Sequence, residues 1–117
     1  MVAEWHARPE HEAFDGFVSG GILGTLLDCH SNWTAIAALM ASSGAAKAPP
    51  TVTTDYTVRF RRPTSSRRPL RLIGRVVELA DASATVETTV ESEGRPTAVG
   101  RATFVIVGPD HPAFGRW

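Results

Sequence analysis

The chain has 117 residues, a formal net charge of zero and a single cysteine. We expect residues 1–117 to form one domain, because that length suits a single hydrophobic core. The neutral balance gives no reason to expect nucleic acid or an anionic membrane as a partner. No apolar run approaches the roughly 20 residues of a membrane span, and no segment has the pattern of a secretory signal. Because the lone Cys29 cannot form an intrachain disulfide, we expect a cytoplasmic protein.

The first third of the sequence predicts one short strand and one long helix. Residues 2–7 alternate loosely, as in a short strand, and residues 8–16 contain a proline and a glycine that are typical of a loop. A helical pattern then covers residues 19–43. Ser19 is a suitable N-cap for this helix, and Gly44 is a suitable C-terminal stop.

From position 51 onward the apolar period changes to two, which predicts four strands at 51–60, 70–79, 84–92 and 97–107. Because the connections are short, we expect these strands to form an antiparallel meander. Gly74 marks a bulge or a close approach in the second strand. A single helix beside one antiparallel sheet must bury itself on that sheet, so the fold class is α+β.

In the strand at 51–60, regular alternation assigns the residues to two faces. One face carries Val52, Thr54, Tyr56, Val58 and Phe60, and the other carries Thr51, Thr53, Asp55, Thr57 and Arg59. Thr53 and Tyr56 are therefore expected on opposite faces.

The helix contains a carboxylate, Asp28, in the middle of an apolar run. At about 100° per residue, its neighbours on the helix surface are mostly small or polar: Gly21, Gly24, Thr25, Ser31, Asn32, Ala35 and Leu39. The opposite face carries Ile22, Leu26, Cys29, Trp33, Ala37 and Met40. We expect this apolar face to pack on the sheet, with Cys29 in the core, Trp33 in the core or a pocket wall, and His30 buried and hydrogen-bonded. The Asp28 face should border a cleft or a second subunit.

The start of the helix carries the adjacent glycines Gly20 and Gly21. Free N–H groups at a helix start suit an anion or oxyanion, and glycines let a ligand approach the backbone. An oxyanion site and a carboxylate are the minimum groups for hydrolysing an ester or a thioester. Gly20 and Asp28 lie about 12 Å apart along a helix axis, too far to act on one carbonyl. Joint catalysis therefore requires a homodimer in which each subunit completes the site of the other.

The segments GFVSGGILGTLLD at 16–28 and TVTTDYTVRFRRP at 51–63, in this order of elements, resemble the hotdog-fold acyl-CoA thioesterase superfamily. The most similar type is the phenylacetate-pathway branch. The resemblance implies a hotdog fold, in which a five- to six-stranded antiparallel sheet wraps one long central helix. It also implies homodimers that pair their sheets side by side, or dimers of such dimers. The implied substrate is an acyl-CoA, and no cofactor is needed because coenzyme A is part of the substrate.

Carried over by position, the resemblance makes Gly20 the amide that polarises the thioester carbonyl and Asp28 the general base or nucleophile. Thr53 falls where some relatives place a hydroxyl that orients water. Ser19 replaces the histidine that is usual before the glycines, and Ala13 stands where many relatives have Asn or Gln. These two departures bear on substrate class and rate more than on the fold.

Further candidates for substrate binding surround these positions. Ser19, Gly21 and Asn32 neighbour Gly20 or Asp28 and are predicted substrate contacts. Seven of the twelve basic residues lie between positions 59 and 75: Arg59, Arg61, Arg62, Arg67, Arg68, Arg71 and Arg75. Guanidinium groups suit phosphate oxygens, and the predicted contacts with coenzyme A phosphates are Arg61, Arg62, Arg67 and Arg68. The alternative is a solvated edge that resists strand aggregation. The histidines lack metal-ligand spacing, and no metal site is expected.

These patterns predict hydrolysis of an acyl-CoA thioester. A second hypothesis, from another functional class, is a non-catalytic acyl or acyl-CoA binding protein on the same fold, and Ser19 and Ala13 favour it. A hydratase on this fold is disfavoured. That branch typically places a His five residues after its Asp, and Trp33 stands there.

Overall fold

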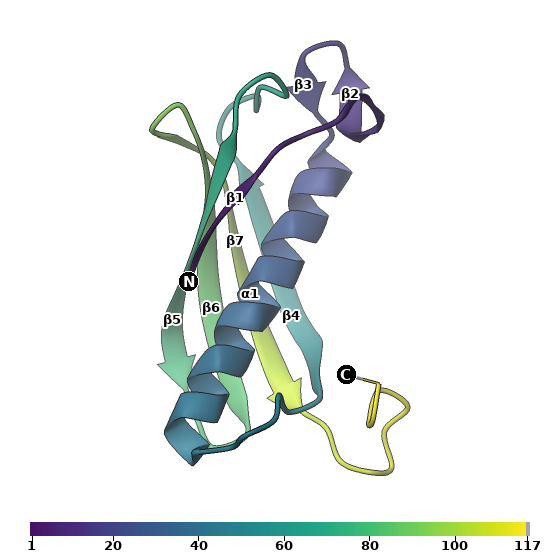
Figure 1. Ribbon diagram of the computed structural model, residues 1–117, viewed down its shortest axis with the longest axis vertical. Helices are drawn as coiled ribbons and strands as arrows, with labels where there is room; N and C mark the ends of the chain where they lie inside the picture. Colours follow the sequence, from purple (N-terminus) through teal and green to yellow (C-terminus); the bar gives the residue numbers. More distant parts are fainter. Residues whose placement is uncertain (117) are drawn as a thin grey trace.

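The computed structural model describes residues 1–116, which form one long helix, a five-stranded antiparallel sheet and a two-stranded sheet (Figure 1). The elements in chain order are β1 (Val2–Trp5), the 3-10 helix η1 (Pro9–His11), β2 (Glu12–Phe14), β3 (Phe17–Val18), α1 (Gly20–Ser43), β4 (Thr51–Phe60), β5 (Leu70–Leu79), β6 (Ser83–Ser92) and β7 (Arg95–Ile106). The predicted helix and strands are confirmed to within two residues at each end. The predicted loop at 8–16 also contains η1 and β2. Within residues 1–116, no helix combines the length and the apolar character that crossing a bilayer requires.

The strand order of the large sheet is β1-β5-β6-β7-β4, so the predicted four-strand meander is wrong in one place. Strands β5, β6 and β7 do form a meander, but β4 pairs with β7 and not with β5. The other side of β5 is occupied by β1, which leaves no room there for β4. The strand β4 is therefore an edge strand, and the segment 61–69 crosses from that edge toward the opposite edge of the sheet, where β5 lies.

The backbone of the crossing segment 61–69 is hydrogen-bonded to the segment that precedes α1. The Val18 N–H donates to the Thr64 carbonyl at 2.9 Å, and the Ser66 N–H donates to the Gly16 carbonyl at 2.9 Å. Gly16 has a φ of +86°, a backbone conformation that favours glycine. These contacts fix the path of the chain into the first turn of the helix.

Both ends of α1 are formed as the sequence predicts. The Ser19 Oγ accepts a hydrogen bond from the Gly21 N–H at 3.3 Å, which caps the first turn. Gly44 ends the helix with a φ of +73°, and its N–H donates to the Met40 carbonyl at 2.9 Å.

The face of α1 that packs on the sheet differs from the predicted one. Its buried residues are Leu23, Leu27, His30, Ser31, Thr34, Ala35, Ile36 and Leu39. Trp33 is 48% exposed and Cys29 is exposed, so the prediction that Cys29 lies in the core is wrong and Trp33 is not a core residue. Ala37, on the same predicted core face, is also exposed.

The surface of the sheet explains this choice of face. A Cβ added at Gly100 would lie 3.1 Å from the Leu27 side chain, and one added at Gly74 would lie 2.2 Å from the Thr34 Oγ1. The helix therefore approaches the sheet closely over these two glycines, and the close approach predicted at Gly74 is confirmed. Ser31 forms a buried hydrogen bond of 2.7 Å with a threonine hydroxyl of β6. Small and polar residues therefore lie at the contact between the helix and the sheet. A helical wheel that looks only for apolar residues does not find this face.

His30 joins the helix to the beginning of the chain. It is 8% exposed, and its Nε2 lies 2.9 Å from the Met1 carbonyl oxygen. Because a carbonyl oxygen only accepts, Nε2 carries the proton in this contact. The same carbonyl accepts the Gly74 N–H at 2.8 Å, so one oxygen just before β1 links the start of the chain to β5 and α1. The predicted buried and hydrogen-bonded histidine is confirmed.

The core consists of two apolar clusters along α1. The cluster at the start of the helix contains Val18, Leu23, Leu27, Leu70, Leu72, Val90 and Ala98. The cluster toward its end contains Ala35, Leu39, Ala84, Val86, Ala102 and Phe104. Strands β5, β6 and β7 supply most of these partners, whereas β4 meets the helix along one side (Figure 1).

Candidate active site

Strand β4 departs from regular alternation at Thr54. Thr53 pairs with Phe104 of β7 and Asp55 pairs with Thr103, so two steps along β4 match one step along β7. This is a β-bulge, which shifts the following residues to the other face of the strand. The predicted assignment of β4 residues to two uninterrupted faces is therefore wrong.

Because of the bulge, Thr53 and Tyr56 both face the helix. The Thr53 Oγ1 donates to the Asp28 Oδ1 at 2.9 Å, and the Tyr56 hydroxyl donates to the Gly24 carbonyl. One turn further along the helix, the Thr51 hydroxyl donates a hydrogen bond to the Asn32 side chain. We call this row of contacts the polar seam; its members are Gly24, Asp28 and Asn32 of α1 and Thr51, Thr53 and Tyr56 of β4.

Asp28 is half-buried in the polar seam. Among residues 1–116, the bond from Thr53 is the one hydrogen bond of its carboxylate, and it engages a single oxygen. Thr53 thus fixes the carboxylate without covering it. The Thr51 Oγ1 donates to the Asn32 Oδ1 at 2.7 Å, which holds that amide one turn away from Asp28. The structure therefore brings together Asp28 and Thr53, two of the predicted catalytic residues.

Tyr56 belongs to the same seam, although the sequence pattern placed it on the other face of β4 from Thr53. Burial, and secondly the negative charge of Asp28, raise the pKa of Tyr56 to about 12. The phenol therefore stays protonated at neutral pH and donates to the Gly24 carbonyl. In an α-helix that carbonyl is also the acceptor for the Asp28 N–H. Tyr56 thus holds the helical turn that carries the carboxylate.

The first turn of α1 borders a hollow of about 330 Å³ that is lined by Val18, Gly20, Leu23, Phe60, Arg61, Arg62, Pro63 and Thr64. Gly20 is exposed, and as the first helical residue its N–H has no intrahelical acceptor. A Cβ added at Gly20 would lie 3.4 Å from the Phe60 ring. The hollow therefore places a backbone donor beside an aromatic ring and two arginines. Phe60 was not a sequence candidate, because no local pattern places the end of β4 beside the start of α1.

Gly20 and Asp28 do not form one centre within this chain. Both lie on the side of α1 that faces β4, but two helical turns, about 12 Å, separate them. Ser19 and Gly21 pair with each other in the N-cap, so the serine hydroxyl and the Gly21 N–H are both engaged. Of the two glycines, Gly20 is the one whose N–H is not used by the Ser19 cap, and Gly20 lines the hollow.

The sequence model of the thioesterase superfamily matches residues 15–99, which include the glycine pair, Asp28 and β4. The chain belongs to the thioesterase superfamily. A comparison with curated protein sequences finds no match.

Several solved structures share this fold. A superfamily protein from Shewanella loihica is 29% identical with a TM-score of 0.75, covering 92% of this chain and 82% of that one. A Streptococcus mutans protein, solved bound to acetyl CoA, is 19% identical with a TM-score of 0.76, covering 92% and 80%. A phenylacetic acid degradation-related protein from Ralstonia eutropha is 20% identical with a TM-score of 0.74, covering 90% and 74%. The predicted hotdog fold and superfamily are confirmed.

In this thioesterase-superfamily chain, the four arginines predicted to bind phosphate fall into two groups. Arg61 and Arg62 line the hollow at Gly20. The Arg67 Nη2 lies 3.1 Å from the Asp15 Oδ2, and the Arg68 Nε lies 3.4 Å from the Glu93 Oε1. Arg67 and Arg68 are therefore directed to carboxylates of neighbouring loops and not to the hollow.

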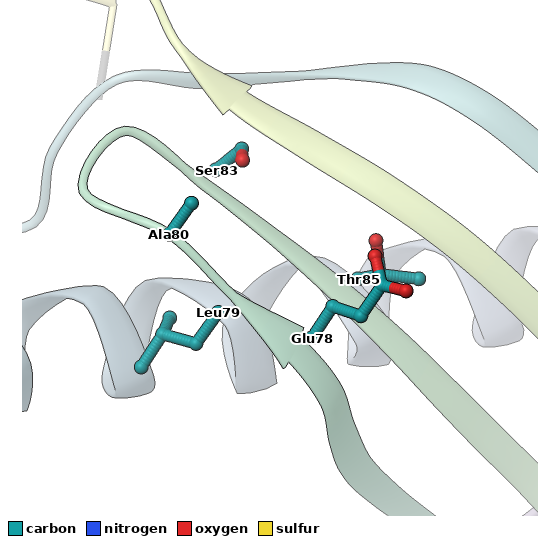
Figure 2. A pocket seen from close by; sticks show the side chains of 5 residues that line it. All are labelled: Glu78, Leu79, Ala80, Ser83 and Thr85. Carbon is teal, nitrogen blue, oxygen red and sulfur yellow. The ribbon is translucent and has the colours of Figure 1, made fainter.

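Another hollow, of about 420 Å³, lies at the turn between β5 and β6 (Figure 2). It is lined by Glu78, Leu79, Ala80, Ser83 and Thr85, none of which was a candidate. The adjoining surface of Leu79 and Ala80 meets Ser42 and Ser43 at the end of α1, so this hollow lies at the opposite end of the helix from Gly20. Within residues 1–116, no group of three or more His, Cys, Asp or Glu side chains could hold a metal ion.

Proposed function

We propose that this chain is an acyl-CoA thioesterase that acts as a homodimer. The observation that carries the proposal is the Asp28 carboxylate, which Thr53 orients at 2.9 Å on the helix side that faces the edge strand β4. A half-buried carboxylate with one unengaged oxygen can take a proton from water. Membership of the thioesterase superfamily supports thioester hydrolysis as the reaction.

The hollow at Gly20 supports an acyl-CoA as the substrate. Val18, Leu23 and Phe60 provide apolar surface for an acyl group, and the Gly20 N–H can donate to its thioester carbonyl. The arginines at the rim suit a ligand that carries phosphates. The Streptococcus mutans neighbour, which was solved bound to acetyl CoA, agrees with this ligand class.

The free edge of β4 supports the homodimer. Within residues 1–116, β4 pairs on one side only, with β7, and its ten residues leave a long edge open for another strand. Along this strand Thr53 lies beside Asp28, and Phe60 lies beside Gly20. If two copies of β4 pair antiparallel about a two-fold axis, the Thr53 end of one strand meets the Phe60 end of the other. That pairing brings Gly20 toward Asp28 of the partner subunit.

The reaction then needs no further group. Asp28 of the partner subunit removes a proton from a water molecule, and the water oxygen attacks the thioester carbon. The Gly20 N–H donates to the carbonyl oxygen while negative charge develops on it. Collapse of the tetrahedral intermediate breaks the carbon–sulfur bond, and the thiolate of coenzyme A receives the proton from the carboxyl group. Direct attack by the carboxylate would use the same two groups.

Replacing the carboxylate tests this assignment. We expect Asp28→Asn to lower kcat for a good acyl-CoA at least about 100-fold, in line with loss of a general base, as measured by thiol release. Glu78→Gln is the matched control and should leave kcat unchanged. Glu78 is an exposed carboxylate of β5, near the end of α1 that lies farthest from Gly20. Wild-type activity in Asp28→Asn would refute the mechanism.

Mixing two inactive variants tests whether the site is composite. Gly20→Pro removes the proposed donor from one subunit, and Asp28→Asn removes the base from the other. In a mixed dimer one of the two sites regains both groups, so activity should return after subunit exchange. A monomer at assay concentration, seen by sedimentation, would contradict the composite site. So would a mixture that exchanges subunits and stays inactive.

A non-catalytic acyl-CoA binding protein is the second candidate. The observation that favours it is the engagement of the Ser19 hydroxyl in the N-cap, together with an exposed alanine at position 13. It predicts binding of acyl-CoA by calorimetry without thiol release over a panel of short, long and aryl acyl groups. A cytoplasmic location, proposed from the lone Cys29, suits either function.

A further inference from the structure

The face of the large sheet that points away from α1 carries a row of charged side chains. Arg75 of β5 pairs with Glu87 of β6, Glu87 pairs with Arg101 of β7, and Arg101 pairs with Thr57 of β4. Residues directly opposite one another on antiparallel strands present their side chains on the same face. Arg59 follows Thr57 on this outer face, because side chains alternate along β4 after the bulge.

Three arginines of this outer face differ from the others near them. Arg59, Arg61 and Arg101 line one hollow of about 290 Å³, together with Thr57, Glu87 and Val99. Among residues 1–116, none of these three guanidinium groups has a carboxylate within ion-pair distance. The carboxylate of the hollow, Glu87, lies 3.1 Å from the Arg75 Nη2 and is thus already paired. The hollow therefore contains three guanidinium charges and one carboxylate, and that carboxylate is already in an ion pair with Arg75.

Arg61 connects this hollow to the site at Gly20. It lines both hollows, because it stands where the chain leaves β4. Its N–H donates to the Thr97 carbonyl at 2.8 Å, and the Arg62 N–H donates to the same oxygen at 3.3 Å. These bonds fix the backbone at the end of β4 and keep Arg61 at the junction. The hollow at the start of α1 and the hollow on the outer face of the sheet thus adjoin at Arg61.

We infer that Arg59, Arg61, Arg101 and the Thr57 hydroxyl form a phosphate-binding site for the nucleotide end of a coenzyme A thioester. This inference rests on the proposed function. Guanidinium groups donate paired hydrogen bonds to phosphate oxygens, and unneutralised arginines leave those donors available. The volume suits phosphate groups more than an entire coenzyme A. The site replaces Arg67 and Arg68, which pair with Asp15 and Glu93.

The test compares one acyl group on two carriers, coenzyme A and pantetheine, because pantetheine lacks the nucleotide phosphates. For the double variant Arg59→Gln/Arg101→Gln, we expect KM for the acyl-CoA to rise about tenfold, as for loss of charge-assisted hydrogen bonds, with KM for the acyl-pantetheine unchanged. The matched control, Arg67→Gln/Arg68→Gln, removes the same charge from the paired arginines and should change neither KM. Added salt should raise the wild-type KM for acyl-CoA more than that of the double variant.

Three results would overturn the inference: an unchanged KM for acyl-CoA in the double variant, an equal rise for both carriers, or an equal effect of the control variant. If the wild-type chain hydrolyses neither carrier, the proposed function fails, and calorimetry then decides the inference by itself. Wild-type chain should bind coenzyme A at least about tenfold more tightly than pantetheine, and Arg59→Gln/Arg101→Gln should abolish that difference. A difference that persists in this variant would place the phosphates elsewhere.

Discussion

The helix α1 meets the sheet in two unlike ways. Against β5, β6 and β7 the contact is close-packed: Leu27 packs against Gly100, and Thr34 packs against Gly74. Against β4 the polar seam adds three hydrogen bonds, two between side chains and one from the Tyr56 hydroxyl to the Gly24 carbonyl. The first contact excludes water and derives its strength from buried area. The second derives its strength from geometry and leaves a carboxylate partly exposed.

This difference separates stability from chemistry. The apolar contact holds the helix in place, so the seam can carry groups whose burial would otherwise be costly. A substitution in the apolar contact should therefore lower the free energy of unfolding, and one at Gly20 or at the contact between Thr53 and Asp28 should mainly lower activity. The other hydrogen bonds of the seam should contribute modestly to stability. Four substitutions test that separation, beginning with the largest expected effect.

Leu27→Ala removes a fully buried side chain from the apolar contact. We expect it to lower the free energy of unfolding by about 2–5 kcal/mol, as for other leucine-to-alanine changes in cores, in a urea titration. Leu79→Ala, the same change at a residue that is 47% exposed, should cost much less. Equal costs would mean that the contact with β5–β7 does not carry the stability of the helix.

Gly20→Pro removes one backbone donor and little else. Proline is well tolerated at the first position of a helix, and Ser19 already has the extended backbone that a following proline requires, with φ −61° and ψ 138°. We expect kcat to fall about 100- to 1,000-fold, as for loss of an oxyanion donor, with the thermal midpoint nearly unchanged. Gly21→Ala, which keeps every N–H, is the control. Full activity in Gly20→Pro would remove that N–H from the mechanism.

Thr53→Val removes the hydroxyl that orients Asp28 and preserves the shape of the side chain. Hydrogen bonds to charged groups contribute about 1.5–3 kcal/mol, so kcat should fall at least about tenfold. Thr51→Val breaks the next hydrogen bond of the seam, to Asn32, and should lower stability with a smaller effect on kcat. If the two variants lose equal activity, the contact with Asp28 has no special function.

Tyr56→Phe removes the hydroxyl that donates to Gly24, at an expected cost of about 1 kcal/mol. Since burial raises the pKa of Tyr56 from 10.0 to about 12, the folded chain keeps a proton that the unfolded chain loses between those values. The free energy of unfolding should therefore decline as pH rises from about 10 to 12. Tyr56 is the one tyrosine of the sequence, so its ultraviolet titration reads directly. A Tyr56→Phe chain that shows the same decline would assign it to other groups.

The elements of the fold were predictable because their signals are local. Ser19 and Gly44 mark the ends of α1 by their chemistry, and alternation identifies β4 and β5 at their observed bounds. The strand order was not predictable in the same way. The strand order depends on the pairing of β1 with β5, a contact between residues about seventy positions apart. No local pattern near the crossing segment 61–69 predicts that pairing.

The candidate site was predictable only in part, and for a physical reason. The spacing of the glycine pair and Asp28 marks the helix, and the structure places Thr53 against that carboxylate. Regular alternation places Thr53 and Tyr56 on opposite faces, because it does not allow for the extra residue at Thr54. The position of Phe60 beside Gly20 depends on how β4 and α1 pack, which no local pattern records. The pairing of Arg67 with Asp15 joins two loops through the tertiary fold, so counting arginines along the chain could not separate paired from unpaired ones.

The bulge at Thr54 also restricts how this chain can change in evolution. Loss of that single residue would rotate the rest of β4 by one face. Tyr56, Val58 and Phe60 would move to the outer surface, and Thr57, Arg59 and Arg61 would turn toward the helix. A one-residue deletion would thus damage the seam and the arginine hollow together, whereas a substitution at Thr54 would spare both. We therefore expect homologous chains to vary in residue type at this position and to keep the length of the strand.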